Sequence, residues 1–361
     1  MPPRPKQQYL SLQAGRGLAA LMVVVFHTTS FVGGDPRYWN LHWLSVRLAG
    51  LALGVEYFFV LSGTVILLAH LNDLGQPRTI PIYFWKRFRR VYPIYWVVLT
   101  FLVLEYALRP QLGSAFQRDP WVIVSGYLLV HVHTLLVNLP VAWTLFHEVL
   151  FYFVFAAFLV GRRFGYAAMG LWCGLSVLML IAPWNVYCGV YLFSPLHLLF
   201  ASGMLVGWLL RERVVAFAPL LTVAGALLFG AAIVWAGTVP DLTYPIDLLA
   251  GAGATLLVLG SARLEEQGAF RVPRPLVFLG DASYSIYLVH YPAFMYLAPI
   301  VYRAWLRWHG PIAIPFVLLT AGATAVGCVV HIRIEKPLLK WMSRRRKAMD
   351  GPAAVPQGLA G

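Results

Sequence analysis

Charged residues are scarce in this sequence, and acidic residues are the scarcest of all. Only 12% of the 361 residues are charged, and 14 Asp and Glu residues stand against 28 Lys and Arg residues. A soluble globular domain carries about 25% charged residues. Hydrophobic residues make up 60% of the chain, and the mean hydropathy is +0.72. The scarcity of charge therefore excludes an ordinary soluble domain and predicts an all-α integral membrane protein.

Cysteine is rare as well, and two other signals are missing. The three cysteines lie in or beside apolar segments without metal-ligand spacing, so we expect no disulfide framework and no metal centre. No small-residue cleavage site follows the first apolar run, which we therefore expect to be a retained span. The net charge of +14 does not indicate nucleic acid, because the basic residues fall in short loops between apolar runs.

Ten apolar runs have the length of about 17–25 residues that a membrane span needs. They lie near 15–32, 51–70, 91–108, 142–160, 165–182, 192–210, 214–236, 244–261, 281–302 and 312–334. An eleventh stretch, 121–140, is apolar enough to be a further candidate for a membrane span. We predict about ten transmembrane helices in one domain over 1–341, followed by a basic, disordered cytoplasmic tail over 342–361.

The distribution of basic residues predicts the orientation. With ten spans and both termini in the cytoplasm, only six of the 28 Lys and Arg residues lie outside, namely Arg37, Arg47, Arg109, Arg118, Arg303 and Arg307. This asymmetry satisfies the positive-inside rule. If 121–140 also crossed, the basic segments after it would change sides. We therefore predict that 121–140 is a non-crossing element on the outer side.

A few ionisable residues fall inside the predicted spans: His27, Glu56, His147, Glu148, His197 and His290. Such groups are expensive in lipid, so each is a candidate for function, and a satisfied hydrogen bond between helices is the alternative for each. His27 follows Arg16 by eleven positions, close to three helical turns, which puts both on one face about 16 Å apart along the axis. Ser283, Tyr287 and His290 likewise form one polar stripe. If these helices meet, they enclose a polar pocket near the bilayer centre.

The cluster WKRFRRVYP carries Lys86, Arg87, Arg89 and Arg90 at the inner end of the third span. It could mark topology and bind lipid headgroups. It could also clamp the phosphates of a polyanionic ligand from the cytosol, together with Arg16.

Two further motifs favour modest roles. Ser62 and Gly63 in FVLSGTV lack the surroundings of a nucleophile elbow and favour close helix packing. His131 and His133 could hold a metal, but no third ligand is evident.

Taken in order, these segments resemble the membrane-bound acyltransferase-3 family, of the O-antigen and exopolysaccharide O-acetylase type. The matching motifs are LQAGRGLAALMVVVFH, GVEYFFVLSGTVI, YFWKRFRRVYPIYW, WTLFHEVLFYF, LGDASYSIYLVHYP and IEKPLLKW, which cover the chain from residue 12 to 341. The Arg-x10-His spacing and the R-x-x-R pattern of Arg87 and Arg90 are typical of the family. Glu56 stands where the family commonly has Asp, and His147 precedes Glu148 where Ser-x-Glu is usual.

The resemblance implies transfer of an acyl group, usually acetyl, from cytosolic acyl-CoA to a hydroxyl group of a sugar or other envelope acceptor. We expect the cell inner membrane of a bacterium as the location, membrane lipids as surroundings, and no metal or nucleic acid as partner. Arg16, Lys86, Arg87 and Arg90 would bind the CoA phosphates.

Within this reading, His27 is expected to be neutral, because burial disfavours the imidazolium ion. It would act as general base toward the acceptor hydroxyl, or as a nucleophile that forms an acyl-imidazole. Glu148 would orient His27 or the acceptor. Oxyanion stabilisation is assigned to Tyr284, Tyr287 or His290, and Glu56 and His147 are expected in the pocket.

Two other functions fit a chain with many spans. A transporter or flippase for a polysaccharide-related or small anionic solute would explain buried carboxylates, but should show two inverted halves. A non-catalytic scaffold in an envelope-polysaccharide complex would tolerate alanine at His27.

Overall fold

The computed structural model describes residues 9–132, 135–182, 189–212, 215–239 and 243–349, and all regular secondary structure in these ranges is helical. The predicted all-α class is therefore confirmed. The helices are α1 (Leu10–Thr29), α2 (His42–Arg47), α3 (Gly54–His70), α4 (Ile80–Leu108), α5 (Pro120–Leu128), α6 (Trp143–Val160), α7 (Arg162–Ile181), α8 (Gly189–Leu192), α9 (His197–Glu212), α10 (Ala218–Ala236), α11 (Tyr244–Glu266), α12 (Arg274–Trp308), α13 (Ala313–Val330) and α14 (Lys336–Met349).

Two π-helical turns extend this framework. They are η1 (Ser30–Gly34), which continues α1, and η8 (His331–Glu335), which joins α13 to α14. The remaining short turns are 3-10 helices: η2 (Ala49–Leu53), η3 (Leu71–Asp73), η4 (Pro77–Thr79), η5 (Pro110–Leu112), η6 (Ala115–Arg118) and η7 (Pro140–Ala142).

Nine helical stretches in the described ranges are long and apolar enough to cross a membrane. They contain α1, α3, α4, α6, α7, α9, α10, α11 and α13, and they match nine of the ten predicted spans. The tenth prediction, 281–302, falls inside α12, which has 35 residues. This helix is less apolar, because it carries residues such as Asp281, Ser283 and His290. The chain is thus an integral membrane protein.

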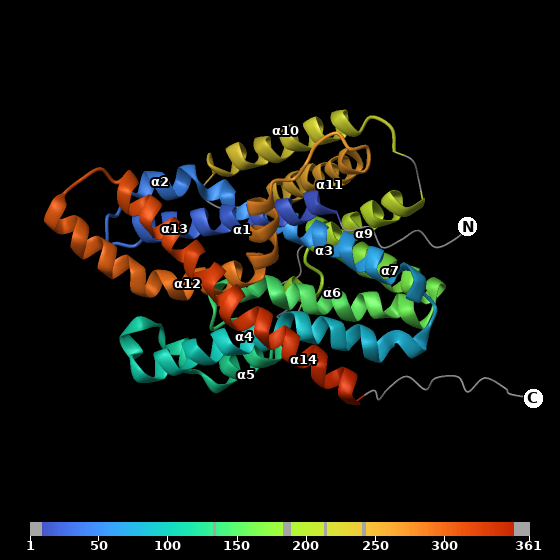
Figure 1. Ribbon diagram of the computed structural model, residues 1–361, viewed down its shortest axis with the longest axis horizontal. Coiled ribbons are helices and arrows are strands. Elements are labelled where there is room, and N and C mark those ends of the chain that lie inside the picture. The colour runs from blue at the N-terminus through green and yellow to red at the C-terminus, as the bar shows by residue number, and fades with distance from the viewer. Residues whose placement is uncertain (1–8, 133–134, 183–188, 213–214, 240–242, 350–361) are drawn as a thin grey trace, which may run out of the picture.

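The helices form a bundle (Figure 1). Its centre is made of buried side chains, and many large apolar side chains are exposed on its outside. Two thirds of the most apolar window of the α3 span are buried, whereas less than a third is buried in the spans that contain α7, α10 and α13. Large apolar side chains such as Leu171, Leu227 and Val317 are exposed on these outer helices. An apolar surface of this kind belongs in lipid rather than in water.

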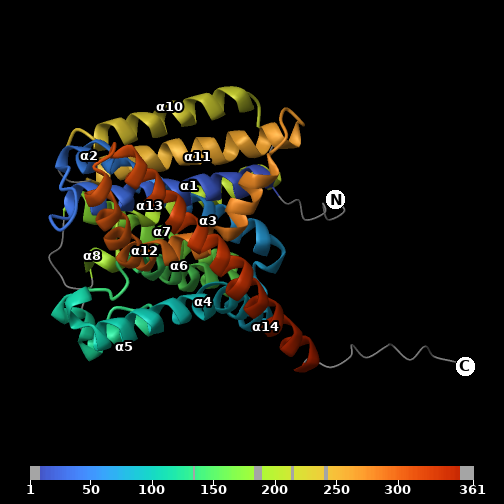
Figure 2. The ribbon, with the colours of Figure 1, turned by 60° about the vertical axis from the view of Figure 1, so that its left-hand side comes forward.

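The bundle has two distinct ends (Figure 2). The end where α1 and α12 begin and α14 projects is here named the basic end, and α2 and α5 lie at the opposite end. Both α1 and α12 run away from the basic end, because Gln13 contacts Asp281 and His27 contacts His290. Residues 342–349 belong to α14, and the rest of the predicted tail lies outside the described residues.

Among the described residues of the stretch 121–140, the α-helix is the nine-residue α5, which begins at Pro120 and ends at Leu128. At 1.5 Å per residue this helix is about 14 Å long, half of the hydrocarbon thickness. Asp119 caps it by accepting a hydrogen bond from the Trp121 amide, and the Tyr92 and Tyr95 hydroxyls bond to its last carbonyls. The prediction of a non-crossing element is confirmed, with α5 folded against α4.

Glycine allows the close helix contacts that position the interior. A Cβ on Gly63 of α3 would lie 2.1 Å from the Phe200 carbonyl oxygen of α9, so packing explains this glycine, as predicted. A Cβ on Gly280 of α12 would lie 2.0 Å from the Gln13 carbonyl oxygen of α1. These contacts hold α1, α3 and α12 tightly enough for their polar faces to meet.

Candidate active site

Three cavities follow one another along α1 and α12. The inner cavity, about 90 Å³, is lined by Arg16, Ser62, Arg90, Thr144, Glu148, Ser283, Tyr284, Tyr287 and six apolar residues. The middle cavity, about 260 Å³, is lined by Val23, Phe26, His27, Ala52, Val55, Glu56, Val141, Trp143, Leu196, Asp247 and Tyr287. The outer cavity, about 220 Å³, is lined by Ser30, Phe31, Asp35, Arg37, Tyr38, Leu112, Tyr291, Met295 and Pro299.

The order of the cavities follows the chain of both helices. Along α1 and η1 the lining passes from Arg16 to His27 and then to Phe31. Along α12 it passes from Tyr284 through Tyr287 to Tyr291, residues spaced by three and four. This spacing keeps them on one helical face. Val55 and Tyr287 line both the inner and the middle cavity and so form the wall between them.

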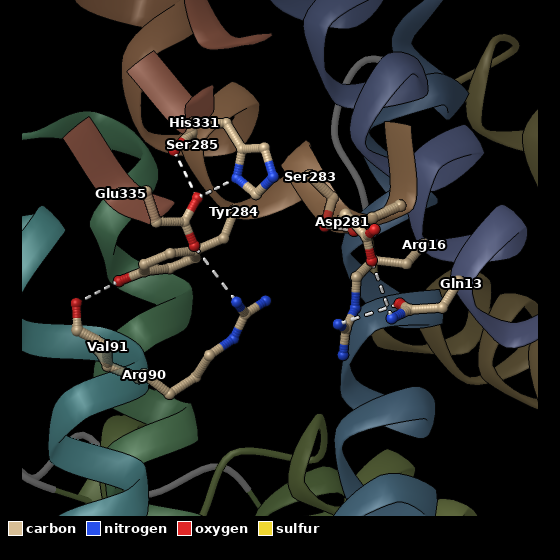
Figure 3. A network of polar contacts seen from close by, with 11 residues as sticks. Gln13, Arg16, Arg90, Val91, Asp281, Ser283, Tyr284, Ser285, His331 and Glu335 are labelled. Atoms are coloured by element: carbon tan, nitrogen blue, oxygen red, sulfur yellow. Dashed lines mark hydrogen bonds and ion pairs between the residues drawn. The ribbon is translucent and has the colours of Figure 1, made fainter. Parts of the chain in front are cut away.

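Two guanidinium groups face the inner cavity from different helices. Arg16 and Arg90 extend toward the same space from opposite sides (Figure 3). Arg16 donates a hydrogen bond of 3.4 Å to Gln13 and makes no ion pair within the described part of the chain. A half-buried cation without a paired carboxylate, facing a cavity, favours an anionic ligand.

Arg90 is held by a network that reaches from the C-terminal part of the chain (Figure 3). Its Nη1 lies 3.3 Å from Glu335, which also accepts hydrogen bonds of 2.7 Å from Ser285 and from His331 Nδ1. The π-helical turn η8 contains both His331 and Glu335. On its other side Arg90 lies over the Tyr284 ring, 5.2 Å from the centroid. The guanidinium group is therefore fixed in place.

Glu148 lines the inner cavity together with Arg16 and Arg90, and not the middle cavity that contains His27. Its Oε1 accepts hydrogen bonds from Ser62, at 3.0 Å, and from Tyr152, at 2.6 Å. The structure thus does not place Glu148 where it could orient His27 directly, because the two residues line different cavities.

Lys86 and Arg87 do not line the inner cavity. Arg87 is separated in space from the cavity residue Glu148 by one side chain, that of Tyr152. The Arg87 guanidinium lies over the ring of Tyr152, 5.8 Å from the centroid, and Tyr152 bonds to Glu148. The Arg87 Nε–H is buried, and no described residue accepts a hydrogen bond from it. Of the four predicted phosphate-binding residues, the structure therefore brings Arg16 and Arg90 together and leaves Lys86 and Arg87 nearby.

The middle cavity contains His27, whose tautomer follows from its contacts. His27 Nδ1 lies 2.9 Å from the Val23 carbonyl oxygen, and a carbonyl only accepts, so Nδ1 carries the hydrogen. His290 Nδ1 likewise donates to the Ile286 carbonyl, which leaves His290 Nε2 as an acceptor 3.3 Å from His27 Nδ1. No described residue bonds to His27 Nε2, which keeps its lone pair for a ligand.

Two carboxyl groups share the middle cavity with His27. Glu56 on α3 and Asp247 on α11 are both buried, and Glu56 Oε2 has no hydrogen-bond partner in the described residues. Sequence reasoning missed Asp247, because it stands only a few residues into the predicted span 244–261 and suggested a position near the lipid headgroups. The sequence feature that could have identified Asp247 is that it is the single acidic residue in the run 244–261.

The predicted oxyanion donors already use their hydrogens elsewhere. The Tyr284 hydroxyl donates to the Val91 carbonyl at 2.7 Å, and the Tyr287 hydroxyl donates to the Val141 carbonyl at 2.8 Å. The His290 hydrogen goes to Ile286, as described above. All three residues lie beside the cavities or His27, but none offers a free donor in this arrangement.

His147 lies in a second pair of histidines. Its Nδ1 is 2.8 Å from Nε2 of His197, which stacks on Trp172, and neither histidine lines any of the three cavities. His131 stacks on Phe146, and its predicted partner His133 lies outside the described residues. Within the described ranges, no group of three or more His, Cys, Asp or Glu side chains is arranged to hold a metal ion.

Three known proteins are similar in sequence to this chain. The chain is 32% identical to the exopolysaccharide production protein ExoZ of Rhizobium meliloti (strain 1021) over 331 residues, 86% of this chain and 94% of that protein. It is 26% identical to the acyltransferase MdmB of Streptomyces mycarofaciens, over 98% of this chain and 97% of that protein. It is 29% identical to protein 2 in the picA locus of Rhizobium radiobacter, over 42% of this chain and 83% of that protein.

No solved structure is significantly similar to the chain. The family model Acyl_transf_3, described as an acyltransferase domain, matches residues 9–333 and so includes all three cavities. Because the family model covers nearly the whole chain and the exopolysaccharide relative is 32% identical over 86% of it, the protein belongs to the acyltransferase-3 family of membrane acyltransferases.

Proposed function

We propose that this membrane acyltransferase moves an acyl group, usually acetyl, from cytosolic acyl-CoA to a hydroxyl group of an extracytoplasmic carbohydrate. The observation that carries the proposal is the order of the cavities, with two arginines in the first and a histidine with an open Nε2 in the second. The carbohydrate acceptor is suggested by the printed name of the exopolysaccharide relative. Because the named relatives come from bacteria, we also propose the inner membrane as the location.

The inner cavity suits the phosphate-bearing part of CoA. Arg16 and Arg90 present guanidinium groups, which bind phosphate oxygens in pairs. Lys86 and Arg87 stand nearer the basic end and would meet the remaining phosphate charge. Glu148 lines the same cavity as Arg16 and Arg90, where its negative charge offsets their mutual repulsion. We therefore assign it to the donor-binding inner cavity rather than to proton transfer.

The transfer itself uses the free nitrogen of His27. Nε2 takes the proton of the acceptor hydroxyl while the oxygen of that hydroxyl attacks the thioester carbon. The carbon–sulfur bond then breaks, the CoA thiolate leaves, and the imidazolium returns the proton to that sulfur. His290 keeps Nδ1 of His27 as the hydrogen-bearing nitrogen, so the lone pair stays on the side that faces the cavity.

In a second version Nε2 attacks the thioester itself, forms an acyl-imidazole and passes the acyl group to the acceptor. The two versions separate in a single turnover without acceptor. Membranes incubated with radiolabelled acetyl-CoA alone would yield labelled protein only in the second version.

The proposal as a whole is tested by His27→Ala in membrane vesicles, with correct insertion verified. We expect transfer from radiolabelled acetyl-CoA to surface glycan to fall by at least about 100-fold. The exposed His309 serves as the matched control, and His309→Ala should transfer normally. Full activity of the His27→Ala protein would refute the proposal, and solute movement without any label transfer would support a transporter instead.

A further inference from the structure

The outer cavity takes no part in donor binding or in the chemistry at His27. Its lining comes from η1 and the residues just after it, from Leu112 and from α12. The segment from η1 to α2 lies at the end of the bundle opposite the basic end (Figure 2). Three aromatic rings line it, together with one acidic and one basic side chain. A cavity with aromatic and charged side chains, next to the proposed reaction centre, is suited to bind a specific ligand.

The charged groups of the outer cavity cancel each other. Asp35 and Arg37 form a two-point ion pair, with Arg37 Nε 3.0 Å from Oδ1 and Nη2 2.6 Å from Oδ2. Partial burial alone would raise the pKa of the Asp35 carboxyl, but the hydrogen bonds and charge of Arg37 outweigh it and lower that pKa. The pair therefore stays ionised and neutral in sum, which suits an uncharged polar ligand better than an anion.

Arg37 still offers donors to a ligand. Its guanidinium is held on one edge by Asp35 and lies over the Tyr38 ring, 5.7 Å from the centroid. No hydrogen bond in the described residues involves its Nη1, whose two hydrogens remain for a hydroxyl oxygen. A guanidinium fixed by its partners loses little freedom when it binds.

The aromatic rings connect the outer cavity to the reacting histidine. Tyr38 contacts Phe31, whose ring lies 5.7 Å from that of Tyr291, and Tyr291 lies 6.2 Å from the His27 ring. Farther out, Tyr38 also meets Tyr302, 5.5 Å away. The rings thus form an unbroken series from the far end of α12 to His27.

A sugar ring matches this combination of groups. Its C–H face is apolar and packs on an aromatic ring, and its rim carries hydroxyls that need donors and acceptors. Tyr291 lines the outer cavity and also contacts the His27 ring, so a single side chain separates the cavity from His27. This short distance would let a hydroxyl of such a sugar reach Nε2. We propose that the outer cavity is the glycosyl subsite of the acceptor and binds a neutral hexopyranose unit. This proposal rests on the proposed acyl transfer, which it deepens.

Binding to the full-length protein in lipid nanodiscs tests the subsite without any chemistry. Saturation-transfer NMR would use methyl β-D-glucopyranoside and methyl β-D-galactopyranoside as probes. We expect Arg37→Gln and Tyr38→Ala each to weaken binding about tenfold, since each removes a direct contact. Tyr38→Phe should retain most of the binding, because it keeps the ring. Arg118→Gln and Trp43→Ala are the matched controls, since both side chains are exposed and lie outside the lining, and they should leave binding unchanged.

The outcomes separate the subsite from the proposed function. Unchanged binding in folded Arg37→Gln and Tyr38→Ala proteins, or no binding of either glycoside to the unmodified chain, would overturn the subsite while leaving the His27 test unaffected. Methyl β-D-glucuronide binding tenfold more tightly than the glucoside would also overturn it, because the cavity would then prefer an anion. Glycoside binding that depends on these residues, without any acyl transfer, would uphold the subsite and refute the proposed function.

Discussion

At the scale of single residues, the proposed chemistry depends on the contact between His27 and His290. Two neutral imidazoles can meet only when one donates and the other accepts. Because both Nδ1 atoms face carbonyl oxygens of their own helices, the direction of the shared hydrogen bond is set by the backbone. We therefore propose a positioning role for His290 in place of the predicted role in oxyanion binding.

That role predicts different behaviour for two variants of His290. His290→Ala should lower kcat by about 10- to 100-fold with little change in the KM for acetyl-CoA, because His27 loses its orientation but the donor cavity is intact. His290→Gln should recover much of the loss, since its side-chain amide oxygen can accept the His27 Nδ1–H. Steady-state kinetics on detergent-purified protein provide the measurement. If Gln were as damaging as Ala in correctly folded protein, His290 would matter for packing alone.

Arg16 permits a second prediction at this scale. Arg16→Gln should weaken the binding of free CoA by about 10- to 100-fold, because a charge-assisted contact to phosphate is lost. Isothermal titration with CoA measures this directly. Arg162, which is exposed at the start of α7, is the matched control, and Arg162→Gln should bind CoA normally. Equal loss in both variants would point to a general charge effect and not to a site.

At the scale of elements, α12 organises the molecule. It contributes residues to every cavity, it is less apolar than the spanning helices around it, and it packs on both α1 and α13. The π-helical turn η8 after α13 returns Glu335 to Arg90, so the end of the chain supports a residue near its beginning. Helix packing, rather than local sequence, therefore builds the donor cavity.

A pair of glycine substitutions tests the α1–α12 contact. Gly280→Ala should destabilise the protein by about 1–3 kcal/mol or more, because the added methyl group meets the Gln13 backbone. Gly174→Ala on α7 has open space and should be neutral or slightly stabilising, since Ala favours helix. Thermal unfolding in detergent, followed by tryptophan fluorescence, compares the two. Similar Tm values for both variants would show that the contact is looser than the structure indicates.

At the scale of the whole molecule, the two ends of the bundle are expected to face different compartments. We predict that Arg162→Cys is labelled by a membrane-impermeant maleimide only from the cytoplasmic side, and Arg118→Cys only from the outside. The background for both would replace Cys173, Cys188 and Cys328 by Ser. Sealed vesicles of known orientation provide the assay. Labelling of both positions from one side would contradict the predicted orientation and, with it, the direction of acyl transfer.

The sequence by itself determined the class of protein, nine of the spans and α12, the short α5, and the shared face of Arg16 and His27. These follow from hydropathy, charge and helical period, which are properties of neighbouring residues. The tertiary structure alone decided that His290 meets His27, that Asp247 joins Glu56, that Glu335 holds Arg90, and that Glu148 lies with the arginines. Each of these contacts but Glu148's joins residues about 190 or more positions apart. Such contacts depend on how helix surfaces interlock, which no local pattern in the chain encodes.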